Sequence, residues 1–151
     1  LAIGDKAPAF SLPANGGKTI SLADYAGRQL VVYFYPKDNT PGCTTESIDF
    51  TNALADFTAA GTDIVGVSAD SVKKHENFIA KHNLGIPLLA DEEQTMLNDY
   101  GVWVEKNMYG RKFMGIERAT YLIAADGTIK QIWRKVKVKG HVEAVLEAAT
   151  S

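Results

Sequence analysis

The only cysteine of the chain, Cys43, lies in the stretch YPKDNTPGCTTES, residues 35–47. A free cysteine kept for packing usually lies in an apolar run, whereas this one follows polar residues and turn-formers. Pro41 suits the first position of a helix, where its missing N–H costs nothing, so Thr40 is the expected N-cap and Cys43 belongs to the first turn. There the sulfur faces unpaired backbone N–H groups and the positive end of the helix dipole. This position favours the nucleophilic thiolate, although the local pattern alone also fits a small inert cysteine.

Other chemistry-bearing residues form weaker patterns. The three histidines, His75, His82 and His141, have no cysteine or carboxylate partners at metal-ligand spacing, so we expect surface histidines and no metal site. No Gly-rich phosphate loop follows a predicted strand, and we expect no cofactor. Trp103 and Trp133 are expected at a pocket rim and in the core.

Length and composition predict one globular domain over residues 1–151, because 46% of the residues are hydrophobic and 23% are charged. The net charge of -2 gives no electrostatic reason to expect a nucleic-acid partner. The longest apolar run, at residues 30–35, is far shorter than the ~20 residues that cross a bilayer, so no membrane association is expected. A single cysteine cannot form an internal disulfide, and no signal-peptide pattern is present, so we expect a cytoplasmic protein.

The hydrophobic pattern predicts alternating strands and helices. Short strands are expected around the Asn-Gly-Gly turn of residues 10–22, buried strands at 29–35 and 63–70, and a short strand at 86–91. Helices are expected from Cys43 to the Gly61 stop, after Ser71, after Asp91 as a cap, and at 141–149. A hairpin with Asp126-Gly127 at its turn is expected over 119–133, and the Lys-Val alternation of 134–141 suggests a strand edge.

This order of elements indicates an α/β fold: a mixed central sheet with helices on both faces and an N-terminal hairpin, with a thioredoxin-like layer as the natural candidate. In open sheets of this kind, functional sites form beyond the carboxyl ends of the strands. Cys43 lies at such a point, after the strand that ends near Tyr35.

The stretch PKDNTPGC resembles the active-site signature of the peroxiredoxins, in which a proline and a threonine precede the peroxidatic cysteine; here they are Pro36, Thr40 and Cys43. Further segments, GDKAPAFSL, GVSADS, LLADEE, YGVWVEKNMYG, GIERATYLI and VKGH, are similar to the peroxiredoxin Q group, also called bacterioferritin comigratory proteins. The resemblance covers almost the whole chain. It implies a thioredoxin-like fold and the reduction of hydroperoxides to water or alcohols.

The resemblance also implies roles for individual residues. Cys43 would attack the terminal peroxide oxygen, Thr40 would hydrogen-bond the peroxide and the sulfur, and Pro36 would shield the pocket from water. The family's active-site arginine falls on Arg118, which Glu46 would help to hold. Without the resemblance, an ion pair of Arg118 with its neighbour Glu117 would be the preferred interpretation.

The chain departs from the family pattern in one respect. Many peroxiredoxin Q proteins carry a second, resolving cysteine, either five residues after the first or in the next helix, and here those positions hold Ile48 and a residue around Ile79. A sulfenic acid on Cys43 would therefore need an external thiol such as thioredoxin, glutathione or glutaredoxin. A monomer or weak homodimer is expected.

Two alternatives remain from the sequence. A thiol–disulfide oxidoreductase normally uses a Cys-x-x-Cys pair, but Cys43 is followed by Thr44, Thr45 and Glu46. A non-catalytic thioredoxin-like binding or chaperone-type module would have no use for the set Pro36, Thr40, Cys43 and Arg118.

Overall fold

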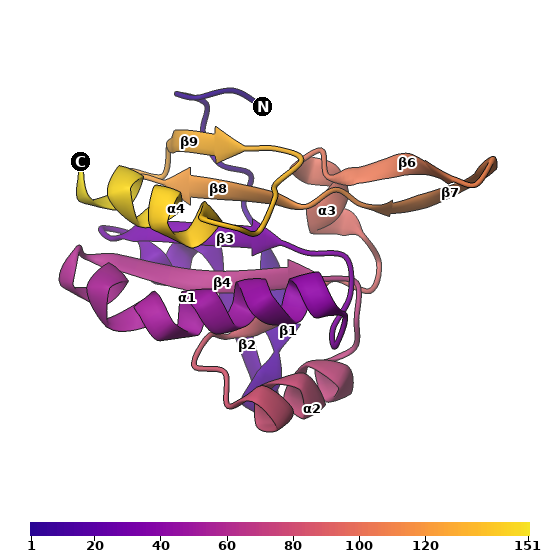
Figure 1. The fold of residues 1–151 in the computed structure, drawn as a ribbon. Coiled ribbons are helices and arrows are strands. Elements are labelled where there is room, and N and C mark those ends of the chain that lie inside the picture. The colour runs from indigo at the N-terminus through magenta and orange to yellow at the C-terminus, as the bar shows by residue number, and fades with distance from the viewer.

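The structure is a computed structural model that describes residues 1–151. Its centre is a seven-stranded sheet with the strand order β2-β1-β5-β4-β3-β8-β9 (Figure 1). Strands β3, β4 and β5 run parallel, whereas β8 pairs antiparallel with β3 and β1 pairs antiparallel with β5, so the sheet is mixed. The strands are β1 Ser11–Ala14, β2 Lys18–Ser21, β3 Gln29–Phe34, β4 Thr62–Ser68, β5 Leu88–Ala90, β8 Ala119–Ile123 and β9 Ile129–Trp133.

Four α-helices cover the sheet: α1 Pro41–Ala59, α2 Val72–His82, α3 Thr95–Asp99 and α4 His141–Thr150. Side chains of a strand alternate between the two faces of a sheet, and β3 is buried on both. Val31 and Tyr33 belong to one hydrophobic cluster, with side chains of α1, α2 and α4. Val32 and Phe34 belong to the other, with side chains of α3 and the N-terminal segment. The predicted α/β fold with both faces covered is therefore confirmed.

Several local predictions are confirmed as well. The N-terminal hairpin turns through a 3₁₀ segment, Asn15–Gly17, and a second 3₁₀ segment, Leu22–Tyr25, follows β2. The hydroxyl of Ser71 accepts a hydrogen bond from the Lys74 N–H at 3.2 Å, as expected for the cap of α2. Gly127 has a φ of 89°, the left-handed conformation that the turn between β8 and β9 requires.

A second hairpin, β6 Trp103–Met108 and β7 Arg111–Ile116, was not expected from the sequence. It forms a separate two-stranded sheet that projects from the body of the molecule (Figure 1). Its turn residues, Tyr109 and Gly110, both have positive φ, 54° and 77°, as a two-residue hairpin turn of type I′ requires. Tyrosine is an unusual residue for that conformation, so the turn carried no recognisable signal.

Two predicted elements are wrong. Residues 134–141 form no strand; β9 is the edge of the sheet, and Lys135 has a φ of 47°, which interrupts the extended backbone. Asp91 is not the N-cap of α3, since Gln94 holds that position. The Asp91 carboxylate nevertheless accepts a hydrogen bond from the Leu97 N–H at 2.8 Å, so it does bind a backbone donor of the helix.

The expectation of surface histidines is also wrong for two of the three. His75 and His141 are 0% and 6% exposed, because each ring finds polar partners inside the protein, whereas His82 is half-buried. Trp103 and Trp133 are half-buried and pack against the hydrophobic clusters of the two sheet faces. No helix has the length and hydrophobicity needed to cross a bilayer.

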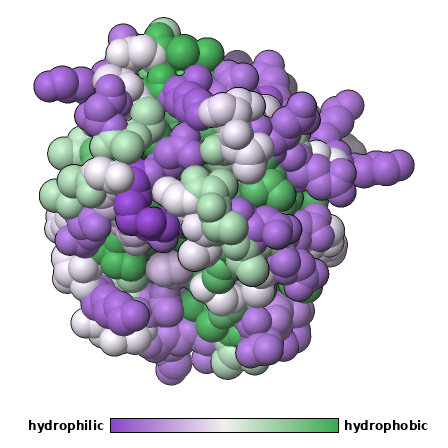
Figure 2. All heavy atoms as spheres, turned by 90° about the vertical axis from the view of Figure 1, so that its left-hand side faces the viewer, coloured by the Kyte–Doolittle hydropathy of each residue, from purple (hydrophilic) through white to green (hydrophobic).

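Large exposed hydrophobic side chains gather mainly on the β6–β7 hairpin, where they are Met108, Tyr109, Phe113 and Met114; the others are Leu1 and Ile3. Figure 2 shows the end of the molecule opposite that hairpin, where hydrophobic side chains are scattered among hydrophilic ones. The two ends of the molecule therefore differ in surface character. The start of α1 and the carboxyl ends of β3 and β4 lie at the hairpin end (Figure 1).

Candidate active site

Cys43 lies in the first turn of α1, as predicted, and is 1% exposed. Pro41 occupies the first helical position, and Thr40 is the N-cap, with the extended backbone that this position requires. The Thr40 hydroxyl does not bind a helix N–H, however, because it donates a hydrogen bond to the Lys37 carbonyl at 2.8 Å. The helix start is thus held by the preceding loop, and the helix N–H groups near the sulfur receive no bond from the cap side chain.

Arg118, in the short connection between β7 and β8, reaches the sulfur from another part of the chain. Its Nη2 donates a hydrogen bond to Cys43 Sγ at 3.3 Å, and its Nη1 donates to Glu46 Oε1 at 2.7 Å. Glu117 does not compete for it, because that carboxylate pairs with Arg134 at 3.1 Å. The position that the family resemblance assigned to Arg118 therefore agrees with the geometry, and the neighbour ion pair does not form.

Gly42 allows this approach of the guanidinium. A Cβ at position 42 would lie 3.2 Å from Arg118 Nη2, closer than nine in ten Cβ contacts in proteins. The absence of a side chain at this position thus leaves room for the donor next to the sulfur.

Glu46 lies one turn after Cys43 and is fully buried. Its Oε1 accepts the hydrogen bond from Arg118, but its Oε2 is buried without any partner. Burial raises the pKa of Glu46 from 4.5 to about 7, although the Arg118 guanidinium opposes this shift. Burial alone lowers the pKa of Arg118, but Glu46 and Cys43 outweigh it and the net shift is upward. The arginine stays charged, and its carboxylate partner titrates near neutral pH.

The remaining predicted residue, Pro36, is half-buried in the loop between β3 and α1. Contacts thus bring Cys43, Glu46 and Arg118 together directly. Thr40 and Pro36 lie close to Cys43 along the chain, but neither donates a hydrogen bond to the sulfur.

A buried polar cluster that sequence reasoning missed fixes the same loop. Asp38 accepts a hydrogen bond from the Tyr35 hydroxyl at 2.6 Å, and its Oδ2 lies 2.7 Å from His75 Nδ1, within hydrogen-bond distance. His75 Nε2 lies 2.8 Å from the carbonyl of Leu89, an acceptor only, so this nitrogen carries a proton. The Asp38 N–H donates to Asp70 Oδ2 at 2.8 Å. The loop before Cys43 is therefore tied to the segment after β4, to α2 and, through His75, to β5.

His141 also lies near the site, at the start of α4. Its Nε2 lies 2.8 Å from the Thr120 hydroxyl, and its ring packs edge-on against Phe50 and Trp133. Burial, and to a lesser extent the Arg118 charge, lowers the pKa of His141 from 6.5 to about 4. The ring is therefore neutral at pH 7.

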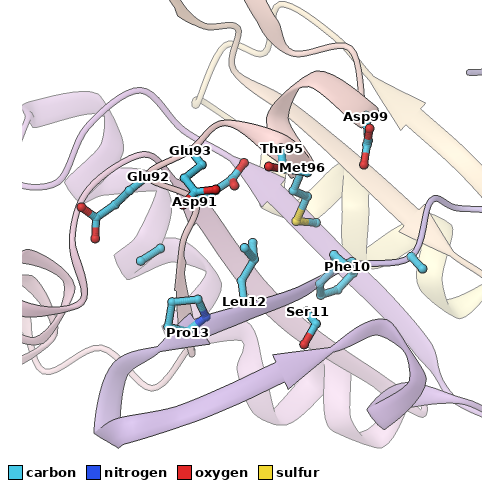
Figure 3. Close-up of a pocket in the computed structure, with 12 residues that line it drawn as sticks. Phe10, Ser11, Leu12, Pro13, Asp91, Glu92, Glu93, Thr95, Met96 and Asp99 are labelled. Atoms are coloured by element: carbon cyan, nitrogen blue, oxygen red, sulfur yellow. The ribbon is translucent and has the colours of Figure 1, made fainter.

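The largest cavity lies elsewhere. It has a volume of about 700 Å³ and is lined by β1 and by the segment from β5 to α3 (Figure 3). Its acidic side chains are Asp91, Glu92, Glu93 and Asp99, and none of the predicted site residues lines it. The candidate site is therefore not a deep cavity but the start of α1, beside the β6–β7 hairpin.

Comparison with known proteins agrees with this geometry. Residues 3–132 match the AhpC/TSA family. Peroxiredoxin Bcp from Xanthomonas campestris pv. campestris is 51% identical over 144 residues, 94% of this chain and 90% of the relative. Peroxiredoxin Bcp from Bacillus subtilis is 47% identical over 147 residues, 97% of this chain and 94% of the relative.

Solved structures give the same result. A structure of the Xanthomonas campestris bacterioferritin comigratory protein, from work on its alkyl peroxide reduction activity, matches with a TM-score of 0.89 and 49% identity; the match covers 93% of this chain and 89% of that one. A structure of Xanthomonas campestris peroxiredoxin Q matches with a TM-score of 0.89 and 50% identity, over 93% and 89% of the two chains. Because the similarity extends over nearly the whole length and includes the fold, the chain belongs to the AhpC/TSA family, and within it to the peroxiredoxins of the Bcp/Q group.

Proposed function

We propose that Cys43 is the peroxidatic nucleophile of this peroxiredoxin, which reduces hydrogen peroxide and organic hydroperoxides by a one-cysteine cycle. A peroxiredoxin is a thiol-dependent peroxidase, so the proposal concerns which residues carry the reaction. The observation that supports it best is the hydrogen bond from Arg118 Nη2 to Cys43 Sγ at 3.3 Å. It links the only thiol to a guanidinium at a helix start, where a nucleophilic thiolate is stabilised.

In the oxidative step, the Cys43 thiolate attacks the terminal oxygen of ROOH. The new S–O bond forms as the O–O bond breaks, and the electron pair of that bond leaves with RO⁻, which takes up a proton to give water or an alcohol. Sulfur is oxidised to the sulfenic acid, and the peroxide is reduced. The Thr40 hydroxyl donates to Lys37, so its lone pairs are free to accept a hydrogen bond from the peroxide O–H.

Ionisation of the thiol cannot supply most of the rate. An ordinary thiol is already a few per cent ionised at pH 7, so full ionisation gains at most roughly 30-fold, and nucleophilicity declines as a thiol becomes more acidic. The larger contribution is assigned to donors aimed at the leaving oxygen and to alignment of the O–O bond with sulfur. The Arg118 guanidinium and the Cys43 backbone N–H are those donors, and Pro36 limits the access of water.

The reductive step requires an external thiol, since Cys43 is the only cysteine and the expected positions of a resolving cysteine, 48 and around 79, hold no thiol. A thiol RSH attacks Cys43–SOH to give a Cys43–SSR mixed disulfide and water, and a second thiol releases RSSR and the Cys43 thiolate. Thioredoxin, glutathione and glutaredoxin are candidate reductants. We further propose that residues 1–151 work as one domain, as a monomer or weak homodimer, in the cytoplasm.

The test is a single turnover without reductant. One equivalent of hydrogen peroxide should add one oxygen to the mass of the protein and make Cys43 reactive toward a dimedone-type probe. Excess peroxide should carry Cys43 on to the sulfinic and sulfonic acids, because no second thiol competes. The Cys43→Ser variant is the control and should remain unmodified.

Two outcomes would contradict the proposal. No mass change in the parent protein would favour the non-catalytic binding module. Rapid formation of a Cys43–Cys43 linked dimer would mean that a second copy resolves the sulfenic acid. The thiol–disulfide oxidoreductase alternative lacks a second thiol near Cys43 and is not favoured.

A further inference from the structure

The β6–β7 hairpin presents one face that carries cations and hydrophobic side chains together. Residues opposite one another in the register share a face, and alternate residues of a strand point the same way. Lys106 lies opposite Phe113, and Val104 lies opposite Gly115, so these four residues belong to one face. Lys112 belongs to the other face, opposite Asn107.

The Lys106 side chain lies across β7 at Gly115. A Cβ on Gly115 would lie 3.1 Å from Lys106 Cδ and 3.4 Å from its Cε, with the Phe113 ring at 3.6 Å. Gly115 thus makes room for the lysine stem three residues before Arg118, just as Gly42 makes room for the Arg118 guanidinium. Gly115 and Gly42 therefore each leave space for one cationic side chain, Lys106 and Arg118 respectively.

Lys106 has no counter-ion. It takes part in none of the ion pairs, which are Arg28–Asp63, Lys74–Asp70, His75–Asp38, Lys112–Glu105, Arg118–Glu46 and Arg134–Glu117. Partial burial lowers the pKa of Lys106, as does the Arg118 charge to a lesser extent, whereas Cys43 and Glu117 oppose the shift. The Lys106 charge therefore interacts electrostatically with both Arg118 and Cys43. A half-buried cation beside another cation is an arrangement that an arriving anion stabilises.

The charge near Lys106 changes during the catalytic cycle. The Cys43 thiolate carries one negative charge, which disappears when the sulfenic acid forms. Glu117, which also acts on Lys106, is already paired with Arg134 at 3.1 Å. Glu46 has a pKa of about 7 and is only partly ionised at neutral pH. Oxidation of the thiolate therefore leaves Lys106 and Arg118 with less balancing negative charge than in the reduced site.

We propose that Lys106 and Arg118 form an anion subsite that binds the carboxylate of a small carboxylated thiol while its sulfur attacks oxidised Cys43. This rests on the proposed one-cysteine cycle and names the chemical class of its reductant. The half-exposed Phe113 ring, 40% exposed, offers an apolar surface for the carbon chain between carboxylate and sulfur. The reduced site, with its thiolate, repels the same anion, so the subsite favours the oxidised state.

The chemistry balances without another reactant. The thiol R–SH and Cys43–SOH give Cys43–S–S–R and water, and the sulfur of R–SH supplies the electron pair of the new S–S bond. The carboxylate takes no part in bond making. It orients the thiol and raises its local concentration.

The test compares two small thiols, 3-mercaptopropionate, which carries a carboxylate, and 2-mercaptoethanol, which is neutral. Their rates of reaction with pre-oxidised Cys43 are each divided by the rate of the same thiol with a small neutral disulfide, which removes intrinsic reactivity. The parent protein should prefer the carboxylated thiol by about fivefold, the size expected for one partly exposed charge pair. The Lys106→Gln variant should lose this preference, and Lys106→Arg should keep most of it.

Lys112→Gln is the matched control, because Lys112 lies on the other face of the same hairpin and pairs with Glu105 at 3.8 Å. It should retain the preference. Equal corrected rates for the two thiols with the parent protein would overturn the anion subsite, as would an equal loss for both thiols in Lys106→Gln. Failure of the parent protein to form a sulfenic acid would instead overturn the proposed function, so the two failures are distinguishable.

Discussion

Two acid–base pairs, one fully buried and one with a half-buried arginine, lie near the loop before α1 on opposite sides of β3. His75 and Asp38 lie on the side of β5, since His75 Nε2 lies 2.8 Å from the Leu89 carbonyl. Arg118 and Glu46 lie on the side of β8, which begins at Ala119. In the first pair, both carboxylate oxygens and both ring nitrogens have partners. In the second pair, Arg118 Nη2 donates its hydrogen bond to the Cys43 sulfur, and Glu46 Oε2 has no partner.

We infer from this difference that the first pair holds the structure and that the second takes part in the proposed reaction. Buried polar groups are almost always satisfied, and a completed network makes a segment rigid. An incomplete one costs stability and leaves donors and acceptors for a reacting molecule. The His75–Asp38 pair holds the loop before Cys43, whereas the less complete Arg118–Glu46 pair contacts the Cys43 sulfur itself.

Removal of the complete pair should have the largest effect on stability. The His75→Leu change leaves the Asp38 carboxylate buried without its main partner, and we expect a loss of about 3–5 kcal/mol in the free energy of unfolding. Urea unfolding should show a lower midpoint with an unchanged slope. The exposed Lys81→Gln change in the same helix is the reference and should shift the free energy by no more than about 0.5 kcal/mol.

The rate of reaction with peroxide is measured on the same His75→Leu variant. At urea concentrations below its unfolding midpoint, the His75→Leu variant should react with peroxide faster than the Arg118→Lys variant. A stability loss under about 1 kcal/mol would show that the pair is not the anchor of the loop.

Alteration of the Arg118–Glu46 pair should instead lower the rate of Cys43 oxidation more than it lowers the stability of the fold. In Arg118→Lys the charge remains, but a compact ammonium cannot contact Sγ and Oε1 together as the planar guanidinium does. We expect the rate of Cys43 oxidation in stopped flow to fall by about 10²–10³, the cost of one lost donor to a developing oxyanion, or about 3–4 kcal/mol.

The same substitution at Arg134, which pairs with Glu117 and is more exposed, controls for a general effect of exchanging arginine for lysine. If Arg118→Lys is oxidised at the parental rate, the arginine has a structural role only. A large loss of stability in Arg118→Lys would also contradict the distinction between a stabilising pair and a pair that takes part in the reaction.

The parts of the site that depend on local sequence could be predicted. The buried β3 run, Pro41 at the first helical position and Cys43 in the first turn follow from neighbouring residues, and all are confirmed. The Arg118–Cys43 contact joins residues 75 positions apart, and local reasoning favoured Glu117 as the partner of the arginine. Only the family resemblance pointed to Arg118 as the arginine that lies beside Cys43.

The missed features share one physical cause. A buried histidine needs hydrogen-bond partners for its ring nitrogens. Asp38, the partner of His75, lies 37 positions away in the sequence, and Thr120, the partner of His141, lies 21 positions away. No local pattern contains that information. The β6–β7 hairpin was missed because its turn begins with Tyr109 at positive φ and because polar residues occur on both of its faces.

The pH dependence of Glu46 should give the smallest of the three effects and tests why its pair is incomplete. The pKa of Glu46 is about 7 in the folded protein and near 4.5 in the unfolded chain, so between these values the folded state holds a proton that the unfolded state has released. Stability from this group is therefore fully present below pH 4.5 and declines as the pH rises to about 7. We expect the parent protein to lose about 2–3 kcal/mol relative to Glu46→Gln between pH 4.5 and pH 8, measured by urea unfolding. The same change at the exposed Glu93 provides the reference for a surface carboxyl. A parent-to-variant difference that does not change with pH, or that grows in favour of the parent as the pH rises, would mean that Arg118 fully compensates the burial of Glu46, and the contrast between the two pairs would disappear.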